Sequence, residues 1–326
     1  MKPRVSVVIE GYNEEATALS KLPDTFNALL GQDYALERVE LIMLGSPRQI
    51  EFWKSLHLEE YSFCGIKMIP VDPDDSHYWR LKNIGAACAE GEIIAHTDSD
   101  SIPGPQWLSS LVRGIESGAD VSVGPSLYRT GRQASDSPWM LAASLPSWSQ
   151  MLARSSSTRK PLAGSIMGHN VALTRQAFLR HPFQTPQRSF SSALLYYELR
   201  RAGVKISFQP EQKVAHSVTL SWWLGRKHFR TGWETYIGRS SDKDWERIPI
   251  LERMKIIEPV VIRMALICRD ARHWFRFAPV VGLSATRTIL LFPVAVLASL
   301  AARTAEMIGM YAVMIAPKST EQQARF

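Results

Sequence analysis

Short apolar, β-branched runs alternate with helical patterns over the first 120 residues or so. The run at 5–9 is continuous, as in a strand buried on both faces of a sheet. Alternation of this kind predicts an α/β fold, a mostly parallel Rossmann-like sheet flanked by helices. We expect strands at 5–9, 39–44, 66–71, 93–96 and 120–124, and helices at 17–30, 49–58, 78–89 and 107–117.

Two carboxylates follow the fourth expected strand directly. Asp98 and Asp100 are one residue apart, and a Pro-Gly-Pro sequence turns the chain just beyond them. Ligands of open α/β sheets bind outside the carboxyl ends of strands. Paired oxygen ligands suit a divalent cation that carries a phosphorylated substrate. A solvated turn uses the same residue types, but the surrounding sequence favours the cation site.

Composition narrows the classes of partner. The 326 residues carry a formal net charge of +7, which favours nucleotide phosphates, nucleic acid or an acidic membrane face. The three cysteines are far apart in the sequence and predict neither a disulfide framework nor a zinc site, as in a protein of a reducing compartment. Residues 1–15 do not have the pattern of a signal peptide, so we expect the bulk of the chain on the cytoplasmic side.

The second half of the chain changes character twice. Residues 129–160 are rich in Arg, Ser, Pro and Gly and predict a lid or acceptor loop with a helix near 140–153. We expect a catalytic domain at 1–240 and a helical, membrane-associated region at 241–326. No identifiable helix for reading bases accompanies the basic residues, so we expect no nucleic-acid partner.

The C-terminal region has two apolar parts. Residues 253–277 mix apolar and basic side chains, a pattern that suits a helix on an anionic membrane surface. Residues 288–302 are uncharged but shorter than the roughly 20 residues of a spanning helix. Arg303 and Glu306 lie three apart and could pair on one helix face, which leaves a continuous span to residue 316 open. The alternative is an ordinary buried helix pair. The basic residues upstream fit the cytoplasmic face of the cell membrane.

Four segments, in order, resemble the family 2 glycosyltransferases, which have the GT-A nucleotide-diphospho-sugar transferase fold. They are VSVVIEGYNEE, RLKNIGAACAEGEIIAHTDSDSIP, GHNVALTR and YYELRRAGVKISFQPEQKVAHS, and the resemblance runs from Val5 to about Trp233. It implies a metal-dependent, inverting transfer of a sugar from a nucleotide-sugar donor to a lipid, polysaccharide or small-molecule acceptor.

The resemblance also implies roles for individual residues. Asp98 and Asp100 match the catalytic metal motif for Mn²⁺ or Mg²⁺, with Asp98 also near the donor ribose, and His216 matches a histidine that completes the metal site. A structural histidine is the alternative for His216. The other residues implied to contact the nucleotide-sugar donor are Tyr12, Asn13 and Glu14 at the nucleoside and Arg80, Lys82 and Asn83 at the diphosphate.

The sequence departs from the family pattern in two places. The second strand ends Met-Leu-Gly-Ser at 43–46, without the acidic residues that hold the nucleotide base. Ser191 and Ser192 stand where a Glu-Asp pair supplies the general base, and a serine hydroxyl is no such base at neutral pH. Glu198 and Asp136 are weak candidates for that role. Arg230 and Trp233 resemble an acceptor-site motif, although a packed tryptophan accounts for the latter equally well.

Two other functions compete with transfer. The first is a catalytically degenerate protein that binds a nucleotide sugar or a partner enzyme, which the two serines favour and the intact acidic pair disfavours. The second is a nucleotidyltransferase, which needs a Gly-rich, cationic loop after the first strand. Residues 11–15 contain one glycine and no cation, so this function ranks a distant third.

Overall fold

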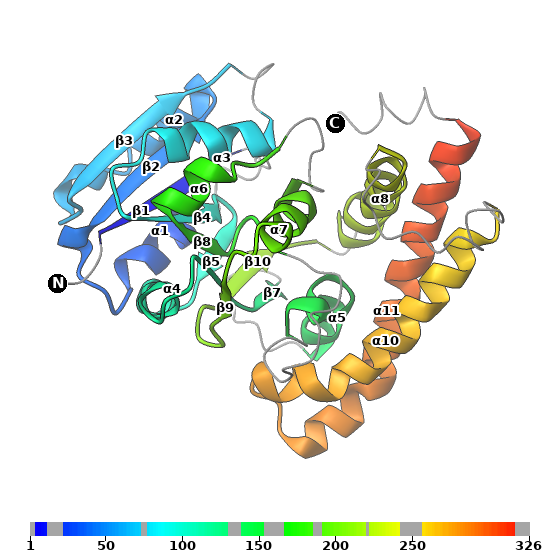
Figure 1. Cartoon of the computed structure of the whole chain (residues 1–326). Coiled ribbons are helices and arrows are strands. Elements are labelled where there is room, and N and C mark those ends of the chain that lie inside the picture. Colours follow the sequence, from blue (N-terminus) through cyan, green and yellow to red (C-terminus); the bar gives the residue numbers. More distant parts are fainter. Residues whose placement is uncertain are drawn as a thin grey trace. The chain divides into compact units, whose positions relative to one another are not determined.

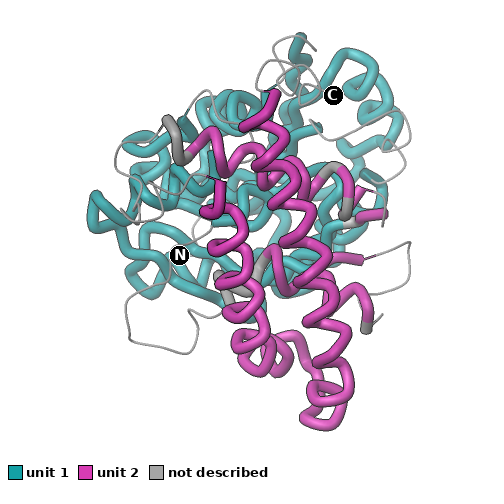
Figure 2. Tube along the Cα trace, turned by 90° about the vertical axis from the view of Figure 1, so that its right-hand side faces the viewer, with its two compact units in different colours: residues 1–127, 154–217 teal, residues 128–153, 218–326 magenta. Residues whose placement is uncertain are grey.

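The computed structural model describes residues 4–11, 22–72, 77–129, 138–152, 166–184, 191–219, 222–241 and 256–316. The chain divides into two compact units, coloured separately in Figure 2. Unit 1 comprises residues 1–127 and 154–217, and unit 2 comprises residues 128–153 and 218–326. The boundary predicted near residue 240 therefore differs from the observed division, in which the predicted lid region contributes a helix to unit 2.

A seven-stranded sheet forms the centre of unit 1 (Figure 1). Its order is β3-β2-β1-β4-β8-β6-β9, and only β8 runs antiparallel to its neighbours. The predicted α/β fold with a mostly parallel sheet is therefore confirmed. The strands are β1 (Val5–Glu10), β2 (Val39–Gly45), β3 (Gly65–Pro70), β4 (Ile93–Asp98), β6 (Val121–Val123), β8 (Val171–Thr174) and β9 (Ile206–Phe208).

Helices and a smaller sheet complete this architecture. The three-stranded sheet has the order β5-β10-β7, from β5 (Ser101–Pro103), β10 (Val214–Ser217) and β7 (Ser126–Arg129). The helices of unit 1 are α1 (Leu22–Leu30), α2 (Pro47–Lys54), α3 (Tyr78–Ala87), α4 (Trp107–Glu116), α6 (Arg175–Arg180) and α7 (Ser191–Arg201), with short 3₁₀ helices η2 (Leu36–Arg38) and η3 (Leu58–Glu60).

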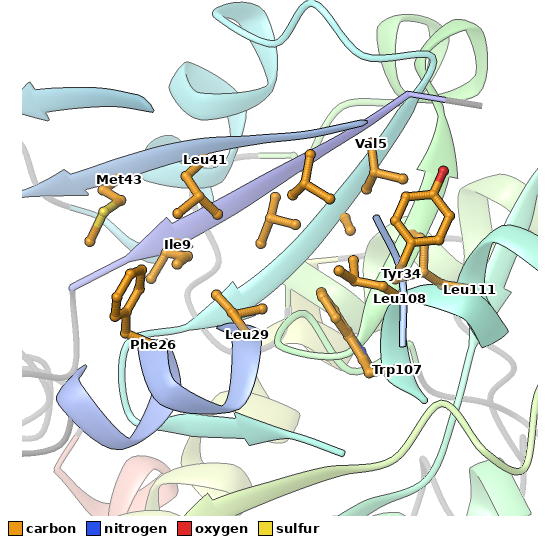
Figure 3. Packing of buried hydrophobic residues seen from close by; sticks show 14 of the residues in the cluster. Val5, Ile9, Phe26, Leu29, Tyr34, Leu41, Met43, Trp107, Leu108 and Leu111 are labelled. Carbon is orange, nitrogen blue, oxygen red and sulfur yellow. The ribbon is translucent and has the colours of Figure 1, made fainter. Parts of the chain in front are cut away.

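The main core of unit 1 lies between the sheet and helices α1 and α4. Figure 3 shows side chains of β1 and β2, such as Ile9 and Leu41, pointing toward Phe26 and Leu29 of α1 and Trp107 of α4. All are buried, because the strands that carry them are covered on both faces and the helices turn one apolar stripe inward. This packing fixes where β1 and β4 end, and hence where the acidic side chains lie.

On the other face of the sheet, α3 approaches the strands closely at Gly85. A Cβ atom on Gly85 would lie 2.4 Å from Val8 Cγ1 and 2.8 Å from Leu44 Cδ1. We expect Gly85→Ala to destabilise the fold by about 1–3 kcal/mol through overpacking, measured by urea unfolding. Gly31→Ala is the matched control, because a Cβ at Gly31 meets only ordinary contacts. Equal stability of the two variants would contradict the close approach.

Unit 2 is a helical assembly. It contains α5 (Pro138–Leu152), the π-helix η5 (Trp222–His228), α8 (Phe229–Ser241), α10 (Glu258–Val280) and α11 (Ala285–Ile315). Helix α5 confirms the helix predicted near 140–153. Helix α11 packs against α5, α8 and α10. Glycines allow α8 and α11 to approach, since a Cβ on Gly309 would lie 2.0 Å from the Phe229 carbonyl oxygen.

A buried ion network joins the helices of unit 2. Arg303 Nη1 donates to Glu306 Oε1 over 2.8 Å, which confirms the predicted pair, and Arg303 Nη2 donates to Asp270 Oδ2 over 2.8 Å. Arg263 lies 3.2 Å from Glu306 Oε2, and the His228 ring bonds Glu306 over 2.9 Å. Burial raises the pKa of Glu306, but the Arg303 and Arg263 charges outweigh burial and hold it well below its usual value. Glu306 is therefore ionised inside the unit.

Candidate functional site

The ends of β1 and β4 lie side by side and carry two acidic side chains. Glu10 pairs with Asp98 in the parallel register of the two strands. The Ser99 N–H donates to the Glu10 carbonyl oxygen over 3.1 Å, and the chain then turns through Asp100 into β5. The sequence around 98–100 thus forms a tight, buried turn at the carboxyl edge of the sheet rather than a solvated one.

Strand β10 brings a histidine to the same turn. His216 pairs with Ser101 in the antiparallel register of β5 and β10, and its Nε2 lies 3.2 Å from Asp100 Oδ1. Ligand atoms of Asp98, Asp100 and His216 all lie within 4.8 Å of one another, and all three residues are buried. The structure therefore brings together the three residues that were expected to bind a metal, from positions as far apart in the sequence as 98 and 216.

The chemistry of this donor set fits a divalent cation. Carboxylate oxygens suit Mg²⁺ and Mn²⁺, whereas an added imidazole nitrogen suits transition-metal ions. Two carboxylates and one imidazole within 4.8 Å therefore fit Mn²⁺ well. The three side chains come from a strand end, a turn and a second strand, so the backbone holds each of them in place.

Lys82 of α3 makes contacts that the sequence did not predict. Its Nζ lies 2.8 Å from Asp98 Oδ1, 3.5 Å from Glu10 Oε1 and 4.5 Å from the centroid of the Tyr78 ring. The whole side chain is buried. A lysine in this position offsets the charge of Asp98 and lies next to Glu10 at the end of the sheet. Its predicted contact with a donor diphosphate stays a prediction.

The electrostatics keep Asp98 ionised. Burial alone raises the pKa of Asp98, but the positive charges of Lys82 and His169 and hydrogen bonds with Glu10 and Lys82 outweigh burial, so this pKa lies well below its usual value. An ionised carboxylate has lone pairs available to a cation. The carboxylate of Asp98 is therefore ionised at neutral pH.

His169 lies next to the acidic cluster, and its place there was not predicted from the sequence. Its ring centroid lies 5.2 Å from that of His216, and its Nε2 is 3.0 Å from Ser126 Oγ. It follows Gly168 in the GHNVALTR segment, which leads into β8. The only sequence feature that pointed to His169 was its place in the GHNVALTR segment. The sequence does not show that this histidine lies next to His216, which is far away along the chain.

The N-terminus of α7 borders the cluster through Tyr78. Ser192 hydrogen-bonds the Tyr78 hydroxyl, and both Ser191 and Ser192 are buried. Burial, followed by the charges of Asp98 and Glu10, raises the pKa of Tyr78 well above its usual value. A neutral phenol and two hydroxyls thus occupy the place where the family pattern has a carboxylate pair.

Two of the predicted residues make other hydrogen bonds. Glu198, the weak candidate for a general base, bonds the His181 ring over 2.8 Å and accepts from Gln184. Asn83 exchanges hydrogen bonds of 2.8 and 3.0 Å with the backbone of Phe183. These contacts give both side chains a part in holding the segment at 181–184 next to α3 and α7.

The remaining predicted residues belong to α3, to unit 2 or to segments outside the described residues. Arg80 lies half-buried on α3. In unit 2, Arg230 Nε donates to Glu234 Oε1 over 2.9 Å, and Trp233 is buried, as in a packed helix. Four positions lie outside the described residues, namely Tyr12, Asn13, Glu14 and Asp136.

The end of the second strand has a structural role. Ser46 caps α2, since its hydroxyl accepts from the Gln49 N–H over 3.3 Å while the Ser46 N–H donates to Gln49 Oε1. Gln49 Nε2 also donates to the Gly11 carbonyl oxygen over 2.9 Å. A capping box thus stands where the family pattern has acidic residues for the nucleotide base.

Two solved structures have a similar fold. The mannosyltransferase PcManGT from Pyrobaculum calidifontis, in complex with GDP-Man and Mn²⁺, is 16% identical with a TM-score of 0.54, over 98% of this chain and 88% of that one. TarS 1–349 from S. aureus, in complex with UDP, is 12% identical with a TM-score of 0.50, over 95% and 91%. These likenesses show that the fold is of the GT-A class.

The family follows from the sequence profile. The profile described as "Glycosyl transferase family 2" matches residues 6–181, more than half of the chain. The chain belongs to glycosyltransferase family 2 and is a glycosyltransferase. A search among curated proteins gave no match.

Proposed function

We propose that this protein is a metal-dependent, inverting glycosyltransferase with a nucleotide-diphospho-sugar donor. The acceptor is a lipid, polysaccharide or small molecule at the cytoplasmic face of the cell membrane. The observation that carries this proposal is the buried cluster of Asp98, Asp100 and His216 at the carboxyl edge of the sheet. Two similar folds support it, since one was solved with GDP-Man and Mn²⁺ and the other with UDP.

Each residue of the site has a separate role in the proposed reaction. Asp98, Asp100 and His216 would hold Mn²⁺ or Mg²⁺, which when bound offsets the negative charge that develops on the departing nucleoside diphosphate. Lys82 orients Asp98 through their 2.8 Å contact and keeps it ionised. The acceptor hydroxyl attacks the anomeric carbon from the face opposite the diphosphate, the bond from that carbon to the diphosphate oxygen breaks, and the hydroxyl proton passes to a base or to water. This single displacement inverts the configuration.

A second function has one specific observation in its favour. Ser191 and Ser192 begin α7, and Glu198 of the same helix is bonded to His181 and Gln184. A protein without a carboxylate base at this helix would bind a nucleotide sugar, or a partner enzyme, without turnover. The acidic cluster is intact, and we therefore place transfer first.

A donor screen by thermal shift tests the proposal. We expect a nucleoside diphosphate or its sugar ester to raise the melting temperature only when Mn²⁺ is present. At a ligand concentration of a hundred times Kd, the free energy of unfolding should increase by about 2.7 kcal/mol.

His216→Ala should lower the affinity for Mn²⁺ at least about tenfold, because one of three ligands is lost. Exposed His57→Ala is the matched control, and equal metal affinity of both variants would remove His216 from the site.

A product assay then separates the two functions. Transfer or hydrolysis of the bound donor supports the enzyme. Saturable, metal-dependent binding with neither reaction supports the binding protein. A screen in which no nucleotide shows metal-dependent stabilisation would contradict both transfer and nucleotide-sugar binding.

A further inference from the structure

Helix α11 has its apolar side chains outward and its polar ones inward. Ile289, Leu290, Leu297, Leu300, Ile308 and Ile315 are 45–82% exposed. With 3.6 residues per turn, these positions fall within an arc of about 100° and form one stripe along the helix. The opposite face carries buried Ser299, Arg303 and Glu306 among alanines. A helix covered only by water would have the reverse pattern.

Helix α10 has a second exposed apolar stripe beside it. Val260, Val261, Met264 and Phe275 are 40–52% exposed and follow the same helical spacing. The two helices pack along their length (Figure 1). The rings of Phe275 and Phe292 are 5.1 Å apart near one end, and the Tyr311 hydroxyl donates to the Ile256 carbonyl oxygen at the other. We call these two stripes the apolar face of unit 2.

Cations gather at the loop that joins the two helices. Arg272, Arg276 and Arg287 are exposed on the last turns of α10 and the first turn of α11. Among the described residues of unit 2, no aspartate or glutamate is exposed, because Glu234, Asp270 and Glu306 are buried and Glu258 is half-buried. The loop end of the apolar face is therefore positively charged, which complements anionic lipid headgroups.

By length and composition, α11 is the one helix of the described chain that is apolar enough to cross a membrane. Its packing disfavours that arrangement. The buried contacts of Arg303 and Glu306 with Asp270 and Arg263 tie α11 to α10. A spanning α11 would carry α10 into the hydrocarbon with it, together with the outward Arg272 and Arg276, and exposed arginines there are costly.

We infer that α10 and α11 lie in the plane of an anionic lipid surface, with the apolar face inserted at the headgroup boundary and the arginines near the loop bound to lipid phosphates. The inference deepens the membrane part of the proposed function and names its mode of attachment. It does not depend on the transfer chemistry, so the two can fail separately.

Vesicle flotation of the full chain tests the surface. We expect binding to vesicles that contain phosphatidylglycerol, with weaker binding to pure phosphatidylcholine and in high salt. Leu290→Glu with Leu297→Glu should reduce binding at least about tenfold. Leu179→Glu is the matched control, since Leu179 is 62% exposed on α6 of unit 1. Equal binding of the control and the double variant, or no binding by the wild type, would overturn the inference.

A fluorescent label on Cys268 distinguishes lying in the surface from spanning. Cys268 is exposed on α10, and Cys64 and Cys88 can be replaced by serine. We expect lipids brominated near the headgroup to quench this label most strongly. A label on exposed Cys64, in Cys88→Ser with Cys268→Ser, should not be quenched. Strongest quenching by lipids brominated deep in the chain would contradict an in-plane helix pair. The Mn²⁺-dependent thermal shift of each labelled protein reports separately on the donor site.

Discussion

Replacing Asp100 by Asn is expected to reduce Mn²⁺-dependent transfer by at least about a hundredfold. Asp100 lies in the turn between β4 and β5 and contacts His216 over 3.2 Å, within the acidic cluster. An amide of the same size removes the negative charge and little else. The loss should appear in turnover measured with the donor that the thermal-shift screen identifies.

Glu59→Gln is the matched control for this variant. Glu59 is an acidic side chain of the same unit, 71% exposed and outside the cluster. It should leave transfer unchanged, while circular dichroism and urea unfolding confirm that Asp100→Asn is folded. Transfer by Asp100→Asn at the wild-type rate, with the same metal dependence, would show that the cluster is not the catalytic metal site.

Replacing Lys82 by Met should destabilise the fold by about 3–5 kcal/mol, because it leaves Asp98 as a buried carboxylate without its cation. Methionine fills a similar volume, so the effect is mainly electrostatic. Urea unfolding at pH 8 measures it. Lys54→Met is the control, since the exposed Lys54–Glu51 pair on α2 should contribute less than about 1 kcal/mol.

The effect of Lys82→Met should depend on pH in a defined direction. In the wild type the pKa of Asp98 is lowered, so its ion pair stabilises the fold above the unfolded pKa of about 4 and is lost as the pH falls toward the lowered value. In the variant the charge of Lys82 no longer opposes burial, so the pKa of Asp98 is higher than in the wild type. The loss of stability is then present at pH 8 and becomes smaller as Asp98 takes up a proton. A difference in stability that is as large at pH 5 as at pH 8 would contradict this explanation.

The sequence was sufficient for the fold of the first 124 residues because the central strands β1, β2 and β4 are buried on both faces. Continuous apolar runs such as those at 5–9 and 39–44 are typical of buried strands and form few other structures. All of the strands expected in the first 124 residues are present. The closeness of Asp98 and Asp100 at this edge was predictable for a related reason. Asp98 and Asp100 follow a strand whose carboxyl end lies at the ligand-binding edge of such sheets.

The contacts of Lys82 and His169 depend on distances that a linear sequence does not contain. Lys82 has the spacing of a helix-surface cation, but Gly85 lets α3 approach β1 so closely that the ammonium reaches Asp98 and Glu10. His169 lies beside His216 only because β8 and β10 return to the same edge. The packing of α5 and α8 on α11, a helix that follows much later in the chain, likewise depends on contacts that the linear sequence does not contain.

The most direct measurement is a titration of the protein with Mn²⁺, followed by electron paramagnetic resonance of the free ion in the presence of a nucleoside diphosphate. The proposed site predicts saturable loss of the free-ion signal with the wild type and little loss with a variant that combines Asp98→Asn and Asp100→Asn. Equal binding of Mn²⁺ by the two folded proteins, or none by either, would contradict it.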